Sequence, residues 1–240
     1  NFPEVSFNLG NIHRKNGDYE IAIKNYKNAI KNKKDYYEAY CNLGNSKKDI
    51  GDVKSARFYY KKALKINPKD SETMWNMHGV SLSIDEAIKW LSECLRTEKS
   101  CLKAKLMLAA LKYLENDKFD FNQLKKTNLK KHPFMRSFGW LFQLNNTPKL
   151  FFNKFNLFDY VIENSISHRP FYEFGVWKGV SFKYILKSIK KGFGFDTFTG
   201  LPENWYNEKV GTYSNNGVVP KMKGGKFIEG SFKDSLPKYF

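Results

Sequence analysis

A stretch near the N-terminal end of the chain repeats itself after 34 residues. The segment from Phe7, FNLGNIHRKNGDYEIAIKNYKNAI, aligns with the segment from Cys41, CNLGNSKKDIGDVKSARFYYKKAL. The positions that carry the same residue in both copies are Leu9/Leu43, Gly10/Gly44, Gly17/Gly51, Ala22/Ala56, Tyr26/Tyr60 and Ala29/Ala63. Small residues at Gly10 and Ala22 let two antiparallel helices approach closely, while Tyr26 and Ala29 lie on an apolar stripe that faces the next copy. The pattern predicts stacked helical hairpins.

The period and the placement of small and aromatic residues resemble the tetratricopeptide repeat. A third copy is shorter, because eight residues rather than twelve separate Gly79 from Ala87, so about one helical turn is missing. A further first helix is expected over 102–114, and the segment 119–131 is expected to cap the array, since terminal repeats are atypical. We therefore expect residues 1–131 to form an N-terminal tetratricopeptide α-solenoid.

The resemblance implies a concave binding face built from the first helix of each repeat. The residues expected to point into it are Glu4, Phe7, Asn11, Arg14, Glu38, Cys41, Asn45 and Lys48. Paired asparagines suggest the repeats that clamp a C-terminal carboxylate, but Phe7 and Cys41 stand where that clamp needs lysine, so we reject it. A protein or peptide partner, docking to the second domain and pure scaffolding remain open.

The net charge of +17 indicates an acidic partner at first sight, because lysines that neutralise phosphates bind nucleic acid strongly. The positive charge comes almost entirely from scattered lysines, and arginine is rare. We interpret most of it as solvated lysine faces and consider nucleic acid an improbable partner. No apolar run approaches the ~20 residues that a membrane-spanning helix needs, so no membrane partner is expected.

Three cysteines, Cys41, Cys94 and Cys101, are odd in number and form no C-x-x-C pair. They indicate a reducing, cytoplasmic setting and buried small side chains. The chain begins with Asn1 and shows no signal peptide pattern, and it is expected to be a fragment at its front end.

The second half of the chain has a different pattern. The His132–Pro133 pair marks a break, and residues 132–154 are interpreted as a connecting helix and linker. Within residues 155–240, an apolar strand over 171–174, a glycine turn, a helix over 180–190 and a strand from Gly192 follow one another. This order is typical of a Rossmann-like doubly wound α/β sheet, which binds its ligand at the carboxyl ends of the strands.

The glycine turn carries the pattern Glu173-x-Gly175-x-x-x-Gly179. A dinucleotide site would need G-x-G-x-x-G, and Glu173 would repel a diphosphate. S-adenosylmethionine suits the pattern better, because Glu173 can attract its ammonium group and main-chain N–H groups near Gly179 and Ser181 can hold its carboxylate. Asp196, at the end of the second strand, is expected to accept both ribose hydroxyls, and the competing structural interpretation makes it a cap for the turn at 197–200. The alternative is a glycine turn without a ligand.

Three segments, EFGVWKGVS, GFDTFTGLPENW and FIEGSFKDSLPKYF, resemble the macrocin-type (TylF-type) O-methyltransferases, which are class I enzymes that methylate hydroxyls, often on sugars. The resemblance covers about residues 155–240. It implies a cofactor loop and a ribose and adenine site made of Glu173, Gly175, Trp177, Gly179, Ser181, Asp196, Thr197, Phe198, Gly230 and Ser231. It also implies S-adenosylmethionine as the cofactor and a carbohydrate or other small hydroxyl compound as the acceptor.

The family's Asp-rich motif, which binds a divalent metal such as Mg²⁺, would lie beyond Phe240. The chain is therefore expected to contain the first part of the methyltransferase sheet, with no catalytic base or metal ligand named, and to be inactive alone. The predicted function is an S-adenosylmethionine-dependent O-methyltransferase with a tetratricopeptide scaffold. The alternative is a non-catalytic interaction protein with a methyltransferase-like remnant.

Overall fold

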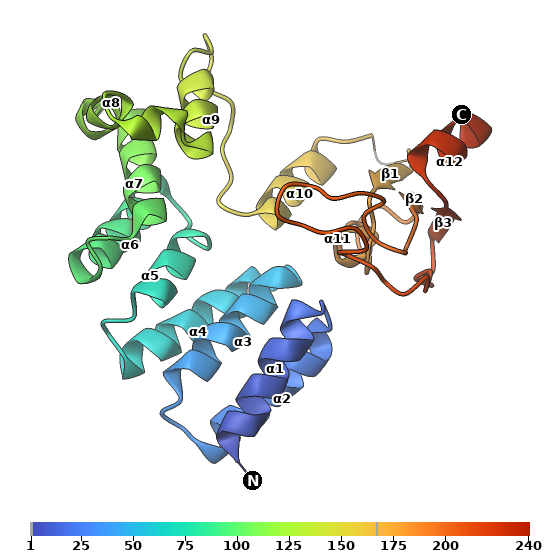
Figure 1. Cartoon of the computed structure of the whole chain (residues 1–240), viewed down its shortest axis with the longest axis horizontal. Coiled ribbons are helices and arrows are strands. Elements are labelled where there is room, and N and C mark those ends of the chain that lie inside the picture. Colours follow the sequence, from blue (N-terminus) through green and yellow to red (C-terminus); the bar gives the residue numbers. More distant parts are fainter. Residues whose placement is uncertain (1, 167) are drawn as a thin grey trace. The chain divides into compact units, whose positions relative to one another are not determined.

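The computed structural model describes residues 2–166 and 168–240 and divides into two compact units, Asn1–Lys154 and Phe155–Phe240 (Figure 1). We call them the repeat unit and the sheet unit. Residues 132–154, interpreted above as a connecting helix and linker, belong to the repeat unit. Among the described residues, no helix is both long and apolar enough to cross a membrane.

The repeat unit begins with two helical hairpins of matching size. They consist of α1 (Pro3–Lys15), α2 (Tyr19–Asn32), α3 (Tyr37–Asp49) and α4 (Val53–Ile66). In each hairpin a glycine of the first helix meets the buried tyrosine of the second: a Cβ added at Gly44 would stand 2.6 Å from Tyr60 Cε1. Gly10 and Tyr26 have the same relation. The predicted hairpin stack is confirmed, with the repeated small residues at the helix crossings.

The third hairpin is shortened as the sequence predicts. Its first helix, α5 (Ser71–His78), has 8 residues where α3 has 13, and α6 (Ile84–Thr97) follows. A later segment of the chain lies at the truncated end of α5: Asn153 Nδ2 donates a hydrogen bond to the Gly79 carbonyl at 3.5 Å. Phe152 packs on the cluster that contains Met74, Leu91 and Leu111.

The remaining helices close the C-terminal end of the array. They are α7 (Leu102–Leu114), α8 (Phe119–Lys125), the 3-10 helix η1 (Asn128–Lys131) and α9 (Pro133–Leu141). The segment 119–131, expected as one helix, is two, because the chain turns at Thr127. Phe142, next to α9, stacks on Tyr113 of α7 with ring centroids 4.0 Å apart. α9 is therefore part of the cap of the repeats.

The sheet unit contains a small parallel sheet. Its elements are α10 (Lys154–Glu163, beginning at the unit boundary), β1 (Phe171–Phe174), α11 (Val180–Ile185), β2 (Gly192–Asp196), β3 (Gly225–Glu229) and α12 (Phe232–Tyr239). The strand order is β1-β2-β3, and both pairings are parallel. α11 ends five residues earlier than the helix expected over 180–190. A parallel sheet is present as predicted, but three strands do not by themselves establish a methyltransferase.

Aromatic side chains fill both faces of this sheet. On the face toward α11, Gly194 of β2 leaves room for the Phe227 ring, whose Cδ1 would stand 2.8 Å from a Cβ at that position. The core on this side is formed by the buried residues Val176, Phe182 and Phe198. On the opposite face, Phe195 contacts the Tyr239 ring of α12 at 5.0 Å. The packing positions the carboxyl ends of the strands side by side.

Candidate functional site

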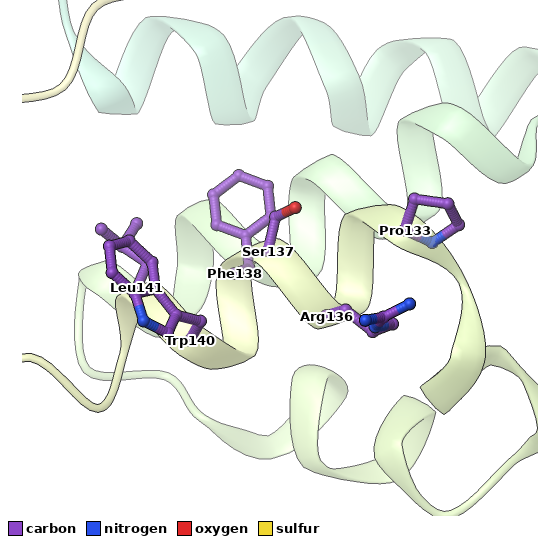
Figure 2. A pocket seen from close by; sticks show the side chains of 6 residues that line it. All are labelled: Pro133, Arg136, Ser137, Phe138, Trp140 and Leu141. Atoms are coloured by element: carbon purple, nitrogen blue, oxygen red, sulfur yellow. The ribbon is translucent and has the colours of Figure 1, made fainter. Parts of the chain in front are cut away.

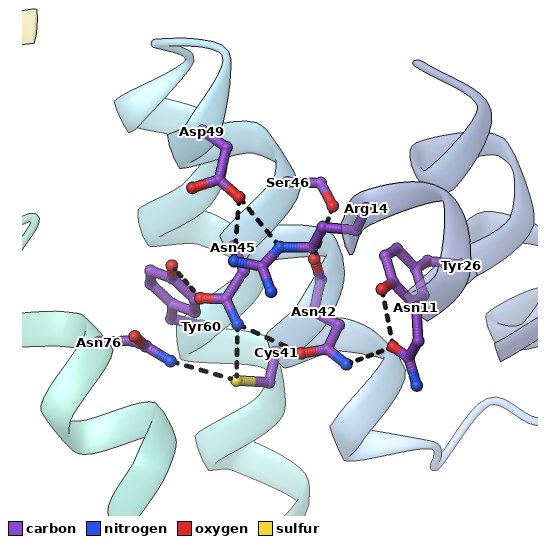
Figure 3. A network of polar contacts seen from close by, with 10 residues as sticks. All are labelled: Asn11, Arg14, Tyr26, Cys41, Asn42, Asn45, Ser46, Asp49, Tyr60 and Asn76. Atoms are coloured by element: carbon purple, nitrogen blue, oxygen red, sulfur yellow. Dashed lines mark hydrogen bonds and ion pairs between the residues drawn. The ribbon is translucent and has the colours of Figure 1, made fainter. Parts of the chain in front are cut away.

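A chain of amide and hydroxyl groups links the first two hairpins (Figure 3). Tyr26 Oη donates to Asn11 Oδ1 at 2.8 Å, and Asn42 Nδ2 donates to the same oxygen at 2.9 Å. Asn45 Nδ2 donates to Asn42 Oδ1 at 3.2 Å, and Tyr60 Oη donates to Asn45 Oδ1 at 2.8 Å. Burial raises the pKa of Tyr26 to about 12, so its hydroxyl stays a donor. The network holds neighbouring repeats in register.

Several residues expected to present free groups to a ligand are engaged inside the repeats. Asn76 Nδ2 donates to Cys41 Sγ at 3.7 Å, and burial raises the pKa of the Cys41 thiol to about 11. Arg14 forms an ion pair with Asp49 at 2.9 Å. Phe7 packs against aromatic rings, with its centroid 5.0 Å from that of Tyr36. These side chains hold the repeats together.

Lys48 is different, because none of the hydrogen bonds or ion pairs found within residues 2–166 and 168–240 involves its ammonium group. Burial is the main influence on the pKa of Lys48 and lowers it. The charge of Asp49 acts in the opposite direction, and that of Arg14 lowers the pKa further. The Lys103 ammonium lies 4.8 Å from the centre of the Trp75 ring. We call Lys48, Trp75 and Lys103 the inner contact set, since each occupies the first helix of its repeat.

A hollow of about 390 Å³ lies where α5 is truncated. It is lined by His78, Ile84, Met107, Leu111, Leu114, Phe138, Thr147, Pro148, Leu150, Phe151 and Phe152. Burial lowers the pKa of His78 to about 4, and the ring contacts Trp75 with centroids 4.1 Å apart. The non-helical segment 147–153 lies against repeat helices here, so this surface accommodates a non-helical stretch of polypeptide.

The sheet unit has a cavity of about 430 Å³ at the carboxyl ends of its strands. It is lined by Gly175, Trp177, Asp196, Thr197, Gly200, Leu201, Pro202, Trp205, Tyr213, Ser231 and Phe232. Half of the ten residues assigned above to a cofactor site line it, namely Gly175, Trp177, Asp196, Thr197 and Ser231. Trp205 and Tyr213 were not identified from sequence, although an aromatic pair within a polar, glycine-rich segment is a signal that could have found them.

The Asp196 carboxylate holds two turns through main-chain hydrogen bonds, one of them the 197–200 turn that its structural alternative predicted. Its Oδ2 accepts hydrogen bonds from the main-chain N–H groups of Val176 and Trp177, both at 2.7 Å. Its Oδ1 accepts from the Phe198 N–H at 2.8 Å. The carboxylate thus fastens the turn after β1 to the turn after β2. Oδ2 thereby uses both of its lone pairs, whereas Oδ1 keeps one that can accept from a ligand.

Glycine is required at two positions of the turn after β1. Gly175 has φ +84° and Gly179 has φ +70°, which is the left-handed region. Gly179 is the residue before the first turn of α11, and a Cβ there would stand 2.6 Å from Met222 Cε. The positive φ angles are by themselves a sufficient reason for glycine at both positions.

The other predicted site residues lie outside the cavity lining. Phe198 is fully buried in the sheet core, so its ring is not beside a ligand as expected. Ser181 lies in the first turn of α11, and Glu173 lies in β1 at the register of Gly194. The Gly230 N–H donates to the Asp196 carbonyl at 3.0 Å.

Ser231 has a structural task in addition to lining the cavity. Its Oγ accepts from the Asp234 N–H at 3.3 Å and donates to Asp234 Oδ2 at 2.6 Å, which caps α12. Among the described residues, no group of three or more His, Cys, Asp or Glu side chains could hold a metal ion.

Comparison with known proteins identifies the repeats. Residues 10–51 match the model described as "TPR repeat", and residues 37–70 match the model described as "Tetratricopeptide repeat". The N-terminal unit thus contains a tetratricopeptide repeat array, which is a protein-interaction scaffold. No curated protein sequence matches the chain.

Solved structures support the same fold for the repeat unit. A crystal structure of MamA protein aligns with TM-score 0.50 and 20% identity over 57% of this chain and 79% of that one. A tetratricopeptide repeat protein from Parabacteroides merdae aligns with TM-score 0.50 and 16% identity over 57% of this chain and 58% of that one. At these identities the likeness concerns the fold alone.

Proposed function

We propose that the repeat unit binds an extended polypeptide through the first helices of its repeats. The observation that carries this proposal is the chain's own segment 147–153, which lies non-helical against α5, α6 and α7 and donates the Asn153 hydrogen bond to Gly79. A partner segment can use the same kind of contact on the inner contact set. Lys48 offers a half-buried ammonium group, and Trp75 offers a partly exposed ring that also contacts Lys103 and His78.

The charge of Lys48 supports this assignment. Lys48 is half-buried, and partial burial of an ammonium group that makes no hydrogen bond or ion pair among the described residues costs free energy, which a bound carboxylate or carbonyl oxygen offsets. In contrast, Arg14 already has Asp49, and Asn45 is used by Tyr60 and Asn42. Partner recognition therefore falls to the inner contact set rather than to the paired asparagines.

A displayed library of random peptides, selected on the full chain, tests the proposal. Selected peptides should lose affinity about tenfold or more in Lys48→Ala and Trp75→Ala variants, as expected for truncated contact residues. Lys62→Ala is the matched control, because Lys62 lies on the second helix of its repeat, where its ammonium contacts the Phe58 ring. Peptides that bind all three variants with wild-type affinity would contradict the proposal.

We propose as a second function that the sheet unit binds S-adenosylmethionine for methyl transfer to a hydroxyl, with a sugar as the expected acceptor. The cavity at the ends of three parallel strands supports it, since ligands of such sheets bind there. Its volume falls within the ~300–1,000 Å³ of small-molecule sites. When bound, the cofactor supplies an electrophilic methyl group.

The residues in the cavity fit the nucleoside end of this cofactor. The remaining lone pair of Asp196 Oδ1 can accept from one ribose hydroxyl, and the rings of Trp205 and Tyr213 can cover a planar base. A third aromatic residue of the lining, Trp177, is held in place by a hydrogen bond from its Nε1 to the Ser214 carbonyl at 3.2 Å. No side chain in the cavity is assigned as a catalytic base.

Calorimetric titration of the full chain with S-adenosylmethionine tests the second function. Trp205→Ala should weaken binding about tenfold, because it removes a ring that lines the cavity. The variant should still fold, because Trp205 is 59% exposed. Tyr206→Ala is the control, since the neighbouring Tyr206 is 94% exposed and does not line the cavity. Absence of heat with the wild-type chain at millimolar cofactor would remove this function and leave the interaction scaffold alone.

A further inference from the structure

Helix α9 presents a mixed apolar and basic face to solvent (Figure 2). The hollow on this face has a volume of about 650 Å³ and is lined by Pro133, Arg136, Ser137, Phe138, Trp140 and Leu141. The intervals of three and four residues between Pro133, Arg136, Ser137 and Trp140 place them on one side of the helix. Trp140 is 64% exposed, whereas Met135 is buried in the cap. We call this surface the α9 face.

The chain around the α9 face is basic without interruption. Residues 121–158 contain no Asp or Glu, and their cations are Lys125, Lys126, Lys130, Lys131, Arg136, Lys149 and Lys154. Lys125 reaches over α9, because its Cε lies 4.0 Å from where a Cβ on Gly139 would stand. Lys130 and Lys131 are exposed in η1, which packs on α9. The local charge is therefore far less balanced than in the rest of the repeats.

The acidic side chains that precede this stretch in the sequence are already paired. Asp120 in α8 and Asp117 just before α8 contact Lys112 Nζ at 3.0 and 3.8 Å. In the repeats, Arg14 and Arg57 each have a carboxylate partner. No carboxylate within the described residues pairs with Arg136, although guanidinium is the side chain best suited to bind one with two hydrogen bonds.

We propose that the α9 face binds an acidic segment of a partner protein, with a carboxylate on Arg136 and an apolar side chain in the hollow beside Trp140. Tryptophan and arginine are the residue types that contribute most to protein interfaces. Charge complementarity steers an acidic segment to the site. This surface is separate from the inner contact set, so the inference goes beyond the function proposed above.

A polypeptide fits this surface better than a lipid bilayer. The apolar side of α9 is turned inward, where Met135, Phe134 and Phe138 pack on the cap. Only Trp140 and Leu141 are left to insert into a bilayer, whereas interfacial helices bury a whole apolar face. The open hollow beside Trp140, in contrast, leaves room for the side chains of a bound polypeptide segment.

Fluorescence anisotropy with the full chain tests the proposal. The probe is a labelled short peptide of glutamates around a central Leu-Phe pair. We expect saturable binding that weakens as salt rises, and a loss of about tenfold or more in Arg136→Glu and in Trp140→Ala. Lys27→Glu and Phe58→Ala are the matched controls, since both residues are exposed elsewhere in the repeats and should leave the affinity unchanged.

Three outcomes would overturn the proposal. The first is equal affinity of the wild type, Arg136→Glu and Trp140→Ala, with thermal melts confirming that all are folded. The second is unchanged binding of a peptide with glutamine in place of glutamate. The third is displacement of the peptide by vesicles of phosphatidylserine and phosphatidylcholine, with the same dependence on Arg136, which would assign the face to a membrane surface.

Discussion

The close contact between α3 and α4 makes Gly44→Ala a quantitative test of the repeat packing. A Cβ at Gly44 would stand 2.6 and 2.7 Å from two carbons of the Tyr60 ring and 3.2 Å from the Ala56 carbonyl oxygen. The ring cannot move away easily, because Tyr60 is fully buried and its hydroxyl donates to Asn45 Oδ1 at 2.8 Å. The added methyl group must therefore separate the two helices or break that hydrogen bond.

The magnitude follows from three contributions. Overpacking of a filled core costs about 1–3 kcal/mol. Breaking the buried Tyr60–Asn45 hydrogen bond costs about 1 kcal/mol more. The higher helix propensity of alanine than of glycine stabilises the folded state by about 1 kcal/mol. We expect Gly44→Ala to lower the free energy of unfolding by about 1–3 kcal/mol, against the stabilisation that helix propensity alone predicts.

Urea denaturation followed by circular dichroism measures this difference. Gly139→Ala is the matched control: it lies within α9, and the nearest atom to its added Cβ is the flexible Lys125 Cε at 4.0 Å. This variant should gain up to about 1 kcal/mol. If Gly44→Ala were as stable as the wild type or more stable, the close helix approach deduced from the repeated glycines would be refuted.

Three further predictions concern single side chains. Burial lowers the pKa of His78 to about 4, so below about pH 6.5 the unfolded chain binds a proton that the folded chain does not. The free energy of unfolding should therefore fall by about 2 kcal/mol between pH 7 and pH 5. If the His78→Leu variant showed the same fall, His78 would not be its cause. Asp196→Ala should speed hydrogen exchange about tenfold or more at the three amides that its carboxylate accepts, and unchanged exchange would show that other contacts hold the turn. Phe152→Ala should release segment 147–153, so trypsin should cleave faster after Lys149; an unchanged rate would mean that Phe152 does not anchor the segment.

The repeated residues were sufficient to predict the helical hairpins. A glycine facing a tyrosine at a fixed interval encodes a close helix crossing, and both copies, Gly10 with Tyr26 and Gly44 with Tyr60, have it in the structure. The shortened third hairpin followed from counting residues between Gly79 and Ala87, and α5 is shorter accordingly. These features depend on residues near one another in the chain, whose spacing the sequence displays directly.

The candidate sites were predicted only in part. The glycines and acidic residue around β1 and β2 indicated a cavity at the strand ends, and Gly175, Trp177 and Asp196 do line one. The sequence offered Asp196 as a cap of the turn at 197–200, but it could not show that its carboxylate would also accept from the N–H groups of Val176 and Trp177, nor that Phe198 would be buried in the core. Whether this cavity binds S-adenosylmethionine stays a prediction.

By itself, the sequence determined the period of the repeats, the position of their helices and the strand-turn-helix order of the second half. Tertiary structure alone decided which polar groups remain available: Asn45 is used by Tyr60 and Asn42, while Lys48 and Arg136 keep no carboxylate partner among the described residues. The physical reason is that helix and strand periodicity arises between near neighbours in the chain. The partner of a hydrogen bond or charge depends on which distant residues folding brings within about 3 Å.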